Sequence, residues 1–216
     1  MGLPVLIYGK SGSGKSRSLK FFREDEVVLF NTEMKELPFR KRFKKTGSSD
    51  DVNKIITTIN RNPEKVIVID DAGYIMTHLF MGNHRNKRGN MSFEMYDDIA
   101  DTMYYLVKRV KTEVKEPDKI VYIIFHEDID ESGIVRLKTI GKQLDRKVCL
   151  EGMVTICLRC MSENRNHFFR TVTDGSDITK TPEEMFRTPE IENNLKLVDD
   201  TIREFYGWKK GETRND

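Results

Sequence analysis

The stretch that decides the fold is Gly9-Lys10-Ser11-Gly12-Ser13-Gly14-Lys15-Ser16, which matches the pattern G-x-x-x-x-G-K-[ST] in full. The apolar run Pro4-Val5-Leu6-Ile7-Tyr8 precedes it, and good helix formers follow it as far as Phe22. Glycines let the backbone curl so that successive N–H groups point at a phosphate, and the start of the next helix adds its positive dipole end. The sequence therefore predicts a strand, a phosphate-binding loop (P-loop) and a helix, in this order.

Within this loop, the type of each residue predicts how it contacts a bound nucleotide. Lys15 is expected to reach the β- and γ-phosphates, and the Ser16 hydroxyl is expected to bind Mg²⁺. The other residues predicted to cradle the nucleotide are Gly9, Lys10, Ser11, Gly12, Ser13, Gly14 and Arg17. A chance glycine-rich turn is disfavoured, because strand and helix signals flank the motif on the required sides. We therefore expect ATP and Mg²⁺ as cofactors.

Three further apolar runs are too short for helices and rich in β-branched residues. They cover residues 27–30, 66–69 and 120–125. Between them lie helical patterns, with apolar residues at helical spacing over 52–59 and again over 95–114, after Ser92 as N-cap. Strands that alternate with helices predict a mainly parallel sheet with helices on both faces.

Beyond Asp130 the pattern changes. Residues 153–158 and 167–172 are predicted to form two late strands, antiparallel to each other, at one edge of the sheet. Thr188 as N-cap and Pro189 at the first helical position predict a helix that ends before Gly207.

No repeat or linker divides the chain. Residues 1–208 are therefore predicted to form one domain, and residues 209–216 a frayed tail.

The composition excludes several classes of protein. The 216 residues carry 37 basic and 35 acidic side chains, a net charge of +2, so any affinity for nucleic acid must come from local patches. No apolar run approaches the roughly 20 residues that cross a bilayer, and no basic leader precedes the first strand, so we expect a cytoplasmic protein without membrane contact. Cys149, Cys157 and Cys160 are not expected to form disulfides, and one C-x-x-C without a second pair is not expected to bind zinc.

Two adjacent carboxylates follow the run 66–69. Asp70 is the expected Walker B residue, which with Ser16 holds Mg²⁺. Its neighbour Asp71 either helps to polarise the attacking water or serves as an N-cap or turn residue. The sequence does not decide between these roles.

Two more polar residues follow predicted strands. Glu33 comes after the run 27–30, and parallel strands end on the same rim as the P-loop, so Glu33 is predicted to activate water in line with the γ-phosphate. It could also simply begin the charged stretch 33–36. His126 ends the run 120–125 and is either a γ-phosphate sensor or a structural histidine.

With these pieces in place, the chain resembles RecA-type ATPases, in particular the compact phage RecA-like proteins linked to single-strand annealing and recombination. The resemblance spans about residues 3–206 and rests on the P-loop, on Asn31-Thr32-Glu33, on Asp70 and on His126. It implies a RecA-like P-loop NTPase core, a mainly parallel sheet with late antiparallel edge strands. It also implies a homo-oligomer with ATP at subunit interfaces. The 216 residues have no room for the flanking domains and polymerisation segment of RecA itself, which counts against a filament.

A later segment adds to the resemblance. Asp177-Ile178-Thr179-Lys180-Thr181-Pro182 resembles the family's stretch of lysines that reach the ATP site of the neighbouring subunit. By this likeness, Lys180 would compensate γ-phosphate charge in trans.

Two basic stretches are candidates for contact with DNA. The stretch 35–45 interleaves Phe39 and Phe43 with basic residues, which suits phosphate neutralisation with base stacking, or is a solvated face with two packed aromatics. The stretch 81–90 is predicted to be a polar loop that faces DNA, or a plain surface loop. The candidate nucleic-acid residues are Arg40, Lys41, Arg42, His84, Arg85, Lys87 and Arg88.

These patterns favour an ATPase that acts on single-stranded DNA in phage recombination, annealing or replication, with a phage single-strand-binding or replication protein as a further partner. A small-molecule or nucleotide kinase is the first alternative, with residues 136–146 as its lid. The second alternative is a nucleotide-gated interaction module such as a helicase loader.

Overall fold

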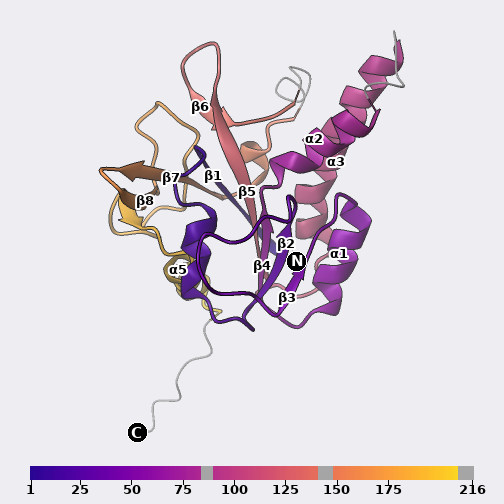
Figure 1. Ribbon diagram of the computed structural model, residues 1–216. Coiled ribbons are helices and arrows are strands. Elements are labelled where there is room, and N and C mark those ends of the chain that lie inside the picture. Colours follow the sequence, from indigo (N-terminus) through magenta and orange to yellow (C-terminus); the bar gives the residue numbers. More distant parts are fainter. Residues whose placement is uncertain (84–89, 141–147, 209–216) are drawn as a thin grey trace, which may run out of the picture.

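A central sheet with helices on both faces forms the core of the chain (Figure 1). The computed structural model describes residues 1–83, 90–140 and 148–208. The strands are β1 (Leu3–Gly9), β2 (Val27–Asn31), β3 (Lys45–Gly47), β4 (Val66–Asp70), β5 (Ile120–Ile129), β6 (Val135–Leu137), β7 (Ile156–Glu163), β8 (Asn166–Arg170) and β9 (Glu190–Glu192). The helices are α1 (Val52–Arg61), α2 (Gly73–Asn83), α3 (Asn90–Glu113) and α5 (Leu195–Phe205), with short 3₁₀ helices η1 (Ser16–Phe21) and η2 (Glu151–Met153).

The strand order is β3-β2-β4-β5-β1-β7-β8-β9, and β6 pairs with β5 outside this path. The pairs from β3 to β7 are all parallel, whereas β5–β6, β7–β8 and β8–β9 are antiparallel. Strand β5 therefore stands between the P-loop strand β1 and the Walker B strand β4. The predicted α/β fold, with a mainly parallel sheet and late antiparallel edge strands, is confirmed.

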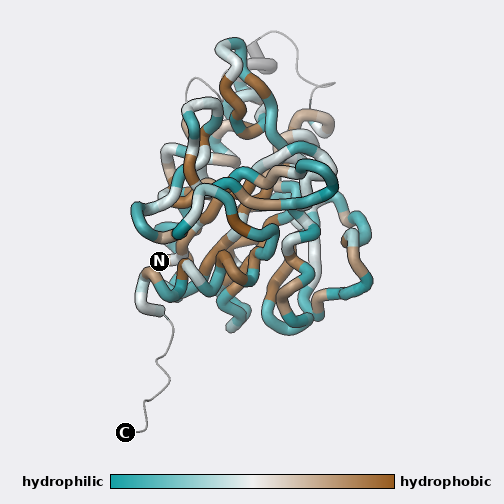
Figure 2. Tube along the Cα trace, turned by 90° about the vertical axis from the view of Figure 1, so that its left-hand side faces the viewer, coloured by the Kyte–Doolittle hydropathy of each residue, from teal (hydrophilic) through white to brown (hydrophobic). Residues whose placement is uncertain are grey.

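Two apolar clusters fill the space on either side of the sheet. One packs α1, α2 and α3 against alternate residues of the central strands, such as Leu6 and Ile69. The other packs η1 and α5 against the opposite residues, such as Ile7 and Val68. In Figure 2 the hydrophobic segments accordingly lie inside the molecule and the polar ones in the outer loops. Because both faces are covered, the central strands read as continuous apolar runs rather than alternating ones.

The sequence missed helix α2 and placed two helix starts wrongly. Ser92 is not an N-cap, because α3 already begins at Asn90. The C-terminal helix does not begin after Thr188, because residues 190–192 pair with β8 as strand β9. Helix α5 starts at Leu195 instead, where the side chain of Asn194 accepts a hydrogen bond from the Leu197 amide.

Several other predictions can be compared with the described residues. Helix formation after the P-loop is confirmed only as the six-residue 3₁₀ helix η1. The single domain over residues 1–208 stays a prediction, and the tail 209–216 lies outside the described residues. The three cysteines are free thiols. No described helix has the length and apolar character that crossing a bilayer requires.

Lys119, which precedes β5, caps the C-terminal end of α1. We therefore expect its ammonium to contribute to stability. Its side chain is fully buried, and its ammonium donates to the carbonyl oxygens of Ile59 at 2.8 Å and Asn62 at 2.5 Å. The Lys119→Met variant keeps the apolar stem but leaves both helix-end carbonyls without this donor. We expect it to lose about 2–4 kcal/mol of unfolding free energy, measured by urea denaturation.

The matched control for Lys119 is Lys115→Ala, an exposed lysine just beyond α3. It should stay within about 0.5 kcal/mol of the wild type. A Lys119→Met protein as stable as the control would show that the stem, and not the ammonium, holds this corner of the fold.

Candidate active site

The P-loop joins β1 to η1 along a path that needs its glycines. Two of them have positive φ, 78° at Gly12 and 103° at Gly14, where other residues are strained. At Gly9 a Cβ atom would lie 2.2 Å from the carbonyl oxygen of Cys160, so the loop has no room for a side chain there. The backbone of the motif therefore follows the curled course that the sequence predicts.

A cavity of about 310 Å³, here called the nucleotide pocket, lies against this loop. Its lining residues are Ser11, Gly12, Gly14, Lys15, Ser16, Arg17, Lys35, Pro38, Asp71, His126 and His167. The predicted phosphate-binding loop thus shares one cavity with two of the predicted strand-end residues, Asp71 and His126. His126 lies inside β5 rather than at its end, because β5 continues to Ile129 and pairs there with β6.

Two hydrogen bonds fix the position of the Lys15 ammonium beside the loop. Only 6% of the residue is exposed, and its ammonium donates to the carbonyl oxygens of Gly9 at 2.9 Å and Lys10 at 2.8 Å. Burial lowers the pKa of Lys15, and the negative charge of Asp71 opposes this effect. An entering phosphate group would stabilise the charged ammonium further and is therefore a favoured ligand at this position.

Asp70 and Ser16 offer the ligands that Mg²⁺ prefers. The buried carboxylate of Asp70 accepts a hydrogen bond from the Ser16 side chain. Among the residues that the structure describes, none donates a hydrogen bond to the Oδ1 atom of Asp70. A buried carboxylate oxygen with a free lone pair beside a hydroxyl fits Mg²⁺, which would supply charge to bound phosphates.

This site differs from a metal site built by protein alone. The described part of the chain holds no group of three or more His, Cys, Asp or Glu side chains that could bind a metal ion. Mg²⁺ does not need one, since it commonly takes one or two protein ligands together with substrate phosphates and water. Ser16 and Asp70 would be those ligands.

The charge of Asp70 gives a prediction that depends on pH. Burial, together with the charge of Asp71, raises the pKa of Asp70 to about 6. The unfolded carboxyl titrates near 4, so the cost of ionising Asp70 in the folded protein is absent below pH 4 and complete above pH 6. Without nucleotide and Mg²⁺, the free energy of unfolding of Asp70→Asn should therefore be about 1–3 kcal/mol larger than that of the wild type at pH 7.5. The variant is then the more stable protein.

Urea denaturation at pH 7.5 and pH 4 checks this prediction. The gain should shrink toward zero at pH 4, and the exposed Asp101→Asn variant should show no comparable gain at either pH. An Asp70→Asn protein that is less stable than the wild type at pH 7.5 would contradict the prediction.

Asp71 stands between Lys35 and His126 at the mouth of the pocket. Its carboxylate lies 2.6 Å from the Lys35 ammonium and 3.3 Å from Nε2 of His126, whose Nδ1 is 3.5 Å from the Lys15 ammonium. Burial alone would raise the pKa of Asp71, but the hydrogen bonds with His126 and Lys35 outweigh it and bring the pKa to about 2. Asp71 also has a positive φ of 56°. Its side chain thus faces the pocket in an ionised state.

Glu33 lies two residues beyond β2, on the rim where β2 and β4 end side by side. Its Oε1 atom is 2.8 Å from Nε2 of His78 on helix α2, and Nδ1 of the same ring is 3.0 Å from Asp50. Burial lowers the pKa of His78, but hydrogen bonds with Asp50 and Glu33 raise it overall. The structure thus holds Glu33 in a fixed hydrogen bond and does not place it in the nucleotide pocket itself.

The remaining predicted residues lie apart from the pocket or outside the described chain. The backbone of Lys180 pairs with Cys157 of β7, so this side chain lies outside the lining of the nucleotide pocket of its own chain. Arg17 lines the pocket and donates to the Asn193 side chain at 3.0 Å. His84, Arg85, Lys87 and Arg88 lie outside the described residues.

The basic stretch 35–45 is only partly available to DNA. Phe43 is buried in the apolar cluster beneath η1 and packs edge to face with Phe39, so stacking of Phe43 on bases is not possible without unpacking it. The ammonium of Lys41 donates to the carbonyl oxygens of Lys20 and Phe22. Arg40 and Arg42 are exposed, the latter beside Glu36 at 3.3 Å.

Sequence reasoning missed three residues of the site: Lys35, His78 and His167. The Nδ1 atom of His167, on β8, lies 2.7 Å from the carbonyl oxygen of Ser13 and supports the loop. Lys35 was grouped with the basic stretch, and His78 lies in a helix that was not predicted. A usable signal for Lys35 was its position two residues after Glu33.

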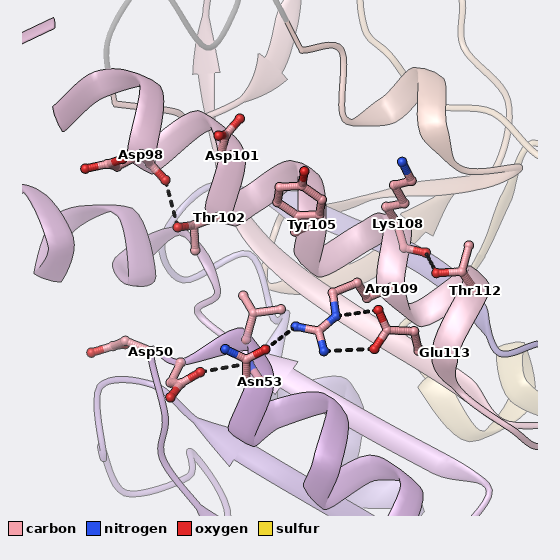
Figure 3. Close-up of a pocket in the computed structure, with 12 residues that line it drawn as sticks. Asp50, Asn53, Asp98, Asp101, Thr102, Tyr105, Lys108, Arg109, Thr112 and Glu113 are labelled. Atoms are coloured by element: carbon pink, nitrogen blue, oxygen red, sulfur yellow. Dashed lines mark hydrogen bonds and ion pairs between the residues drawn. The ribbon is translucent and has the colours of Figure 1, made fainter. Parts of the chain in front are cut away.

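A second cavity is larger than the nucleotide pocket. A groove of about 720 Å³ lies between the start of α1 and helix α3, with Asp50 and Asp101 on its rim and Tyr105 in its wall (Figure 3). Arg109 spans it, paired with Glu113 and bonded to Asn53. Asp50 joins this groove to Glu33 through His78.

A family model covers most of the chain. The model of a family described as "AAA domain" matches residues 1–189, a span that contains the P-loop, Asp70, His126 and Lys180. No curated protein matches the chain.

Proposed function

This chain belongs to the AAA domain family, the nucleotide-binding ATPase type of P-loop protein, and from that premise we propose that it is a RecA-like ATPase stimulated by single-stranded DNA. The observation that carries the proposal is the grouping of Lys15, Asp71 and His126 around one pocket, with Asp70 beneath it and Glu33 on the same rim. A Mg-bound nucleotide, a sensor of its terminal phosphate and a carboxylate for water activation are the parts that hydrolysis requires.

Hydrolysis here means attack of water on the γ-phosphorus and cleavage of its bond to the β–γ bridging oxygen, which yields ADP and inorganic phosphate. Lys15 stabilises negative charge on the phosphates, and Ser16 and Asp70 hold Mg²⁺, which neutralises further charge when bound. Glu33 orients the water and accepts its proton. In this proposal Glu33 leaves His78 to do so, since it lies outside the pocket at rest.

The link to DNA is proposed from the segment 35–42. Lys35 and Pro38 line the nucleotide pocket, while Arg40 and Arg42 of the same segment are exposed. A polyanion that binds the two arginines would therefore act on a segment that also lines the nucleotide pocket. In the proposal Lys180 completes the site of a neighbouring copy, and a phage origin follows only from the resemblance to RecA-like proteins.

The test is release of inorganic phosphate from MgATP, with and without an unstructured oligo(dT). Lys15→Ala is the blank, and Lys54→Ala, an exposed lysine on α1, is the matched control. We expect DNA to stimulate the wild type and the control, and Arg40→Ala/Arg42→Ala to lower the stimulation and its salt dependence.

Other outcomes would replace this proposal. Hydrolysis that ignores DNA at every salt concentration would leave a nucleotide-gated module such as a helicase loader. Transfer of phosphate to an acceptor would indicate a kinase, although Arg136, in its candidate lid, is already paired with Asp130 and Glu151.

A further inference from the structure

Lys35 has a position that neither the motif nor the resemblance assigns. It lies beyond β2, lines the nucleotide pocket and places its ammonium 2.6 Å from the Asp71 carboxylate. Its side chain is 55% exposed, and its ammonium lies over the ring of Tyr74, 5.2 Å from the ring centroid. Lys35 is therefore a partly exposed cation at the mouth of the pocket, paired with the carboxylate of Asp71.

A series of contacts links Lys35 to Lys15, across one side of the nucleotide pocket. Asp71 bridges Lys35 and His126, and His126 in turn approaches Lys15, the residue that reaches the β- and γ-phosphates. Lys15, His126, Asp71 and Lys35 thus form a series across the mouth of the pocket, in which each side chain contacts the next.

This arrangement has an electrostatic consequence. A terminal phosphate brings additional negative charge close to the ionised Asp71, and two anions in a partly buried site repel each other strongly. The repulsion is relieved if a cation already present moves from the carboxylate to the phosphate. Lys35 is bound to that carboxylate and is the more exposed, more flexible member of the pair.

We propose that Lys35 recognises, within its own chain, the terminal phosphate of a nucleoside triphosphate. The Asp71 carboxylate binds the Lys35 ammonium until this phosphate takes the place of the carboxylate. The inference rests on the proposed function for the identity of the ligand but not on hydrolysis or DNA. Lys35 then distinguishes a triphosphate from a diphosphate, because only the triphosphate reaches its ammonium. The free-energy cost of this exchange is the loss of the ion pair between Lys35 and Asp71.

The experiment compares two affinities in each variant. Isothermal titration calorimetry measures binding of MgADP and of the non-hydrolysable analogue Mg-AMPPNP to the full chain, and the ratio of the two dissociation constants is the readout. In Lys35→Ala the AMPPNP affinity should fall about 10- to 100-fold, since one charge-assisted contact is lost, while the ADP affinity changes less than about threefold. Lys54→Ala should leave both affinities unchanged.

Two further variants make the exchange itself testable. Asp71→Asn removes the competing anion and should shift the ratio several-fold toward the triphosphate, opposite to Lys35→Ala. In the double variant the ratio should lie between those of the two single variants, because the terminal phosphate loses the Lys35 contact but no longer faces the Asp71 carboxylate. Lys35→Arg keeps the charge and should retain most of the preference.

Equal losses for both nucleotides in Lys35→Ala would overturn the proposal, since Lys35 would then only hold the pocket in shape. An unchanged ratio in either single variant would overturn it as well. A wild type that binds both nucleotides but releases no phosphate from MgATP would refute the proposed ATPase while leaving the affinity ratio as a valid test of Lys35.

Discussion

The Lys15→Ala variant is expected to bind MgATP at least about 100-fold more weakly than the wild type and to release no phosphate above background. Two or more charge-assisted hydrogen bonds from one ammonium to the phosphates account for a loss of this size. The loss of unfolding free energy is a separate quantity, because the Lys15 ammonium also donates to the carbonyl oxygens of Gly9 and Lys10. Calorimetry with MgATP and thermal unfolding without nucleotide measure the two effects.

Lys54→Ala is the matched control for this loss, as an exposed lysine outside the pocket. A Lys15→Ala protein that still binds MgATP within about threefold of the wild type would mean that the P-loop is not the nucleotide site.

The second large effect is expected at Glu33. In Glu33→Gln the rate of ATP hydrolysis should fall about 10²- to 10⁴-fold, because an amide cannot accept the proton of the attacking water. MgATP affinity should change less than about threefold, since Glu33 does not line the pocket. The glutamine oxygen can still accept a hydrogen bond from His78, so the local structure should persist. Single-turnover hydrolysis and calorimetry separate the two quantities.

Asp71→Asn, measured in the same assay, decides between the two candidate carboxylates. If Glu33→Gln hydrolyses ATP at the wild-type rate and Asp71→Asn does not, water activation belongs to Asp71. A loss of MgATP affinity in Glu33→Gln that matches its loss of rate would instead assign Glu33 to binding.

The parallel core was predictable because its signals are local and strong. The four apolar runs lie within β1, β2, β4 and β5, and the helical spacing over 52–59 matches α1. The P-loop was predictable for the same reason, since its glycines and Lys15 act through their own backbone and side chain. A strand buried on both faces and a phosphate-binding turn each need particular residue types at consecutive positions, so both can be recognised from a short stretch of sequence.

The errors come from contacts between distant segments. Residues 190–192 form β9 because β8 offers an open edge, and this pairing overrides the helix signal of Thr188 and Pro189. Helix α2 is apolar around most of its surface and so lacks the one-sided spacing by which a helix is recognised.

The role of Lys35 was hidden for a similar reason. Its partner Asp71 is far away in sequence, and no pattern of consecutive residues reveals an ion pair across the rim of a sheet.

The His78 bridge has one more consequence. Asp50 belongs both to the groove between α1 and α3 and to the hydrogen-bonded series that ends at Glu33. By thermodynamic linkage, any change of charge at Asp50 alters the proton affinity of His78 and with it the ease of freeing Glu33, and the reverse holds to the same extent. The groove and the rim that carries Glu33 are therefore energetically coupled through a single imidazole ring.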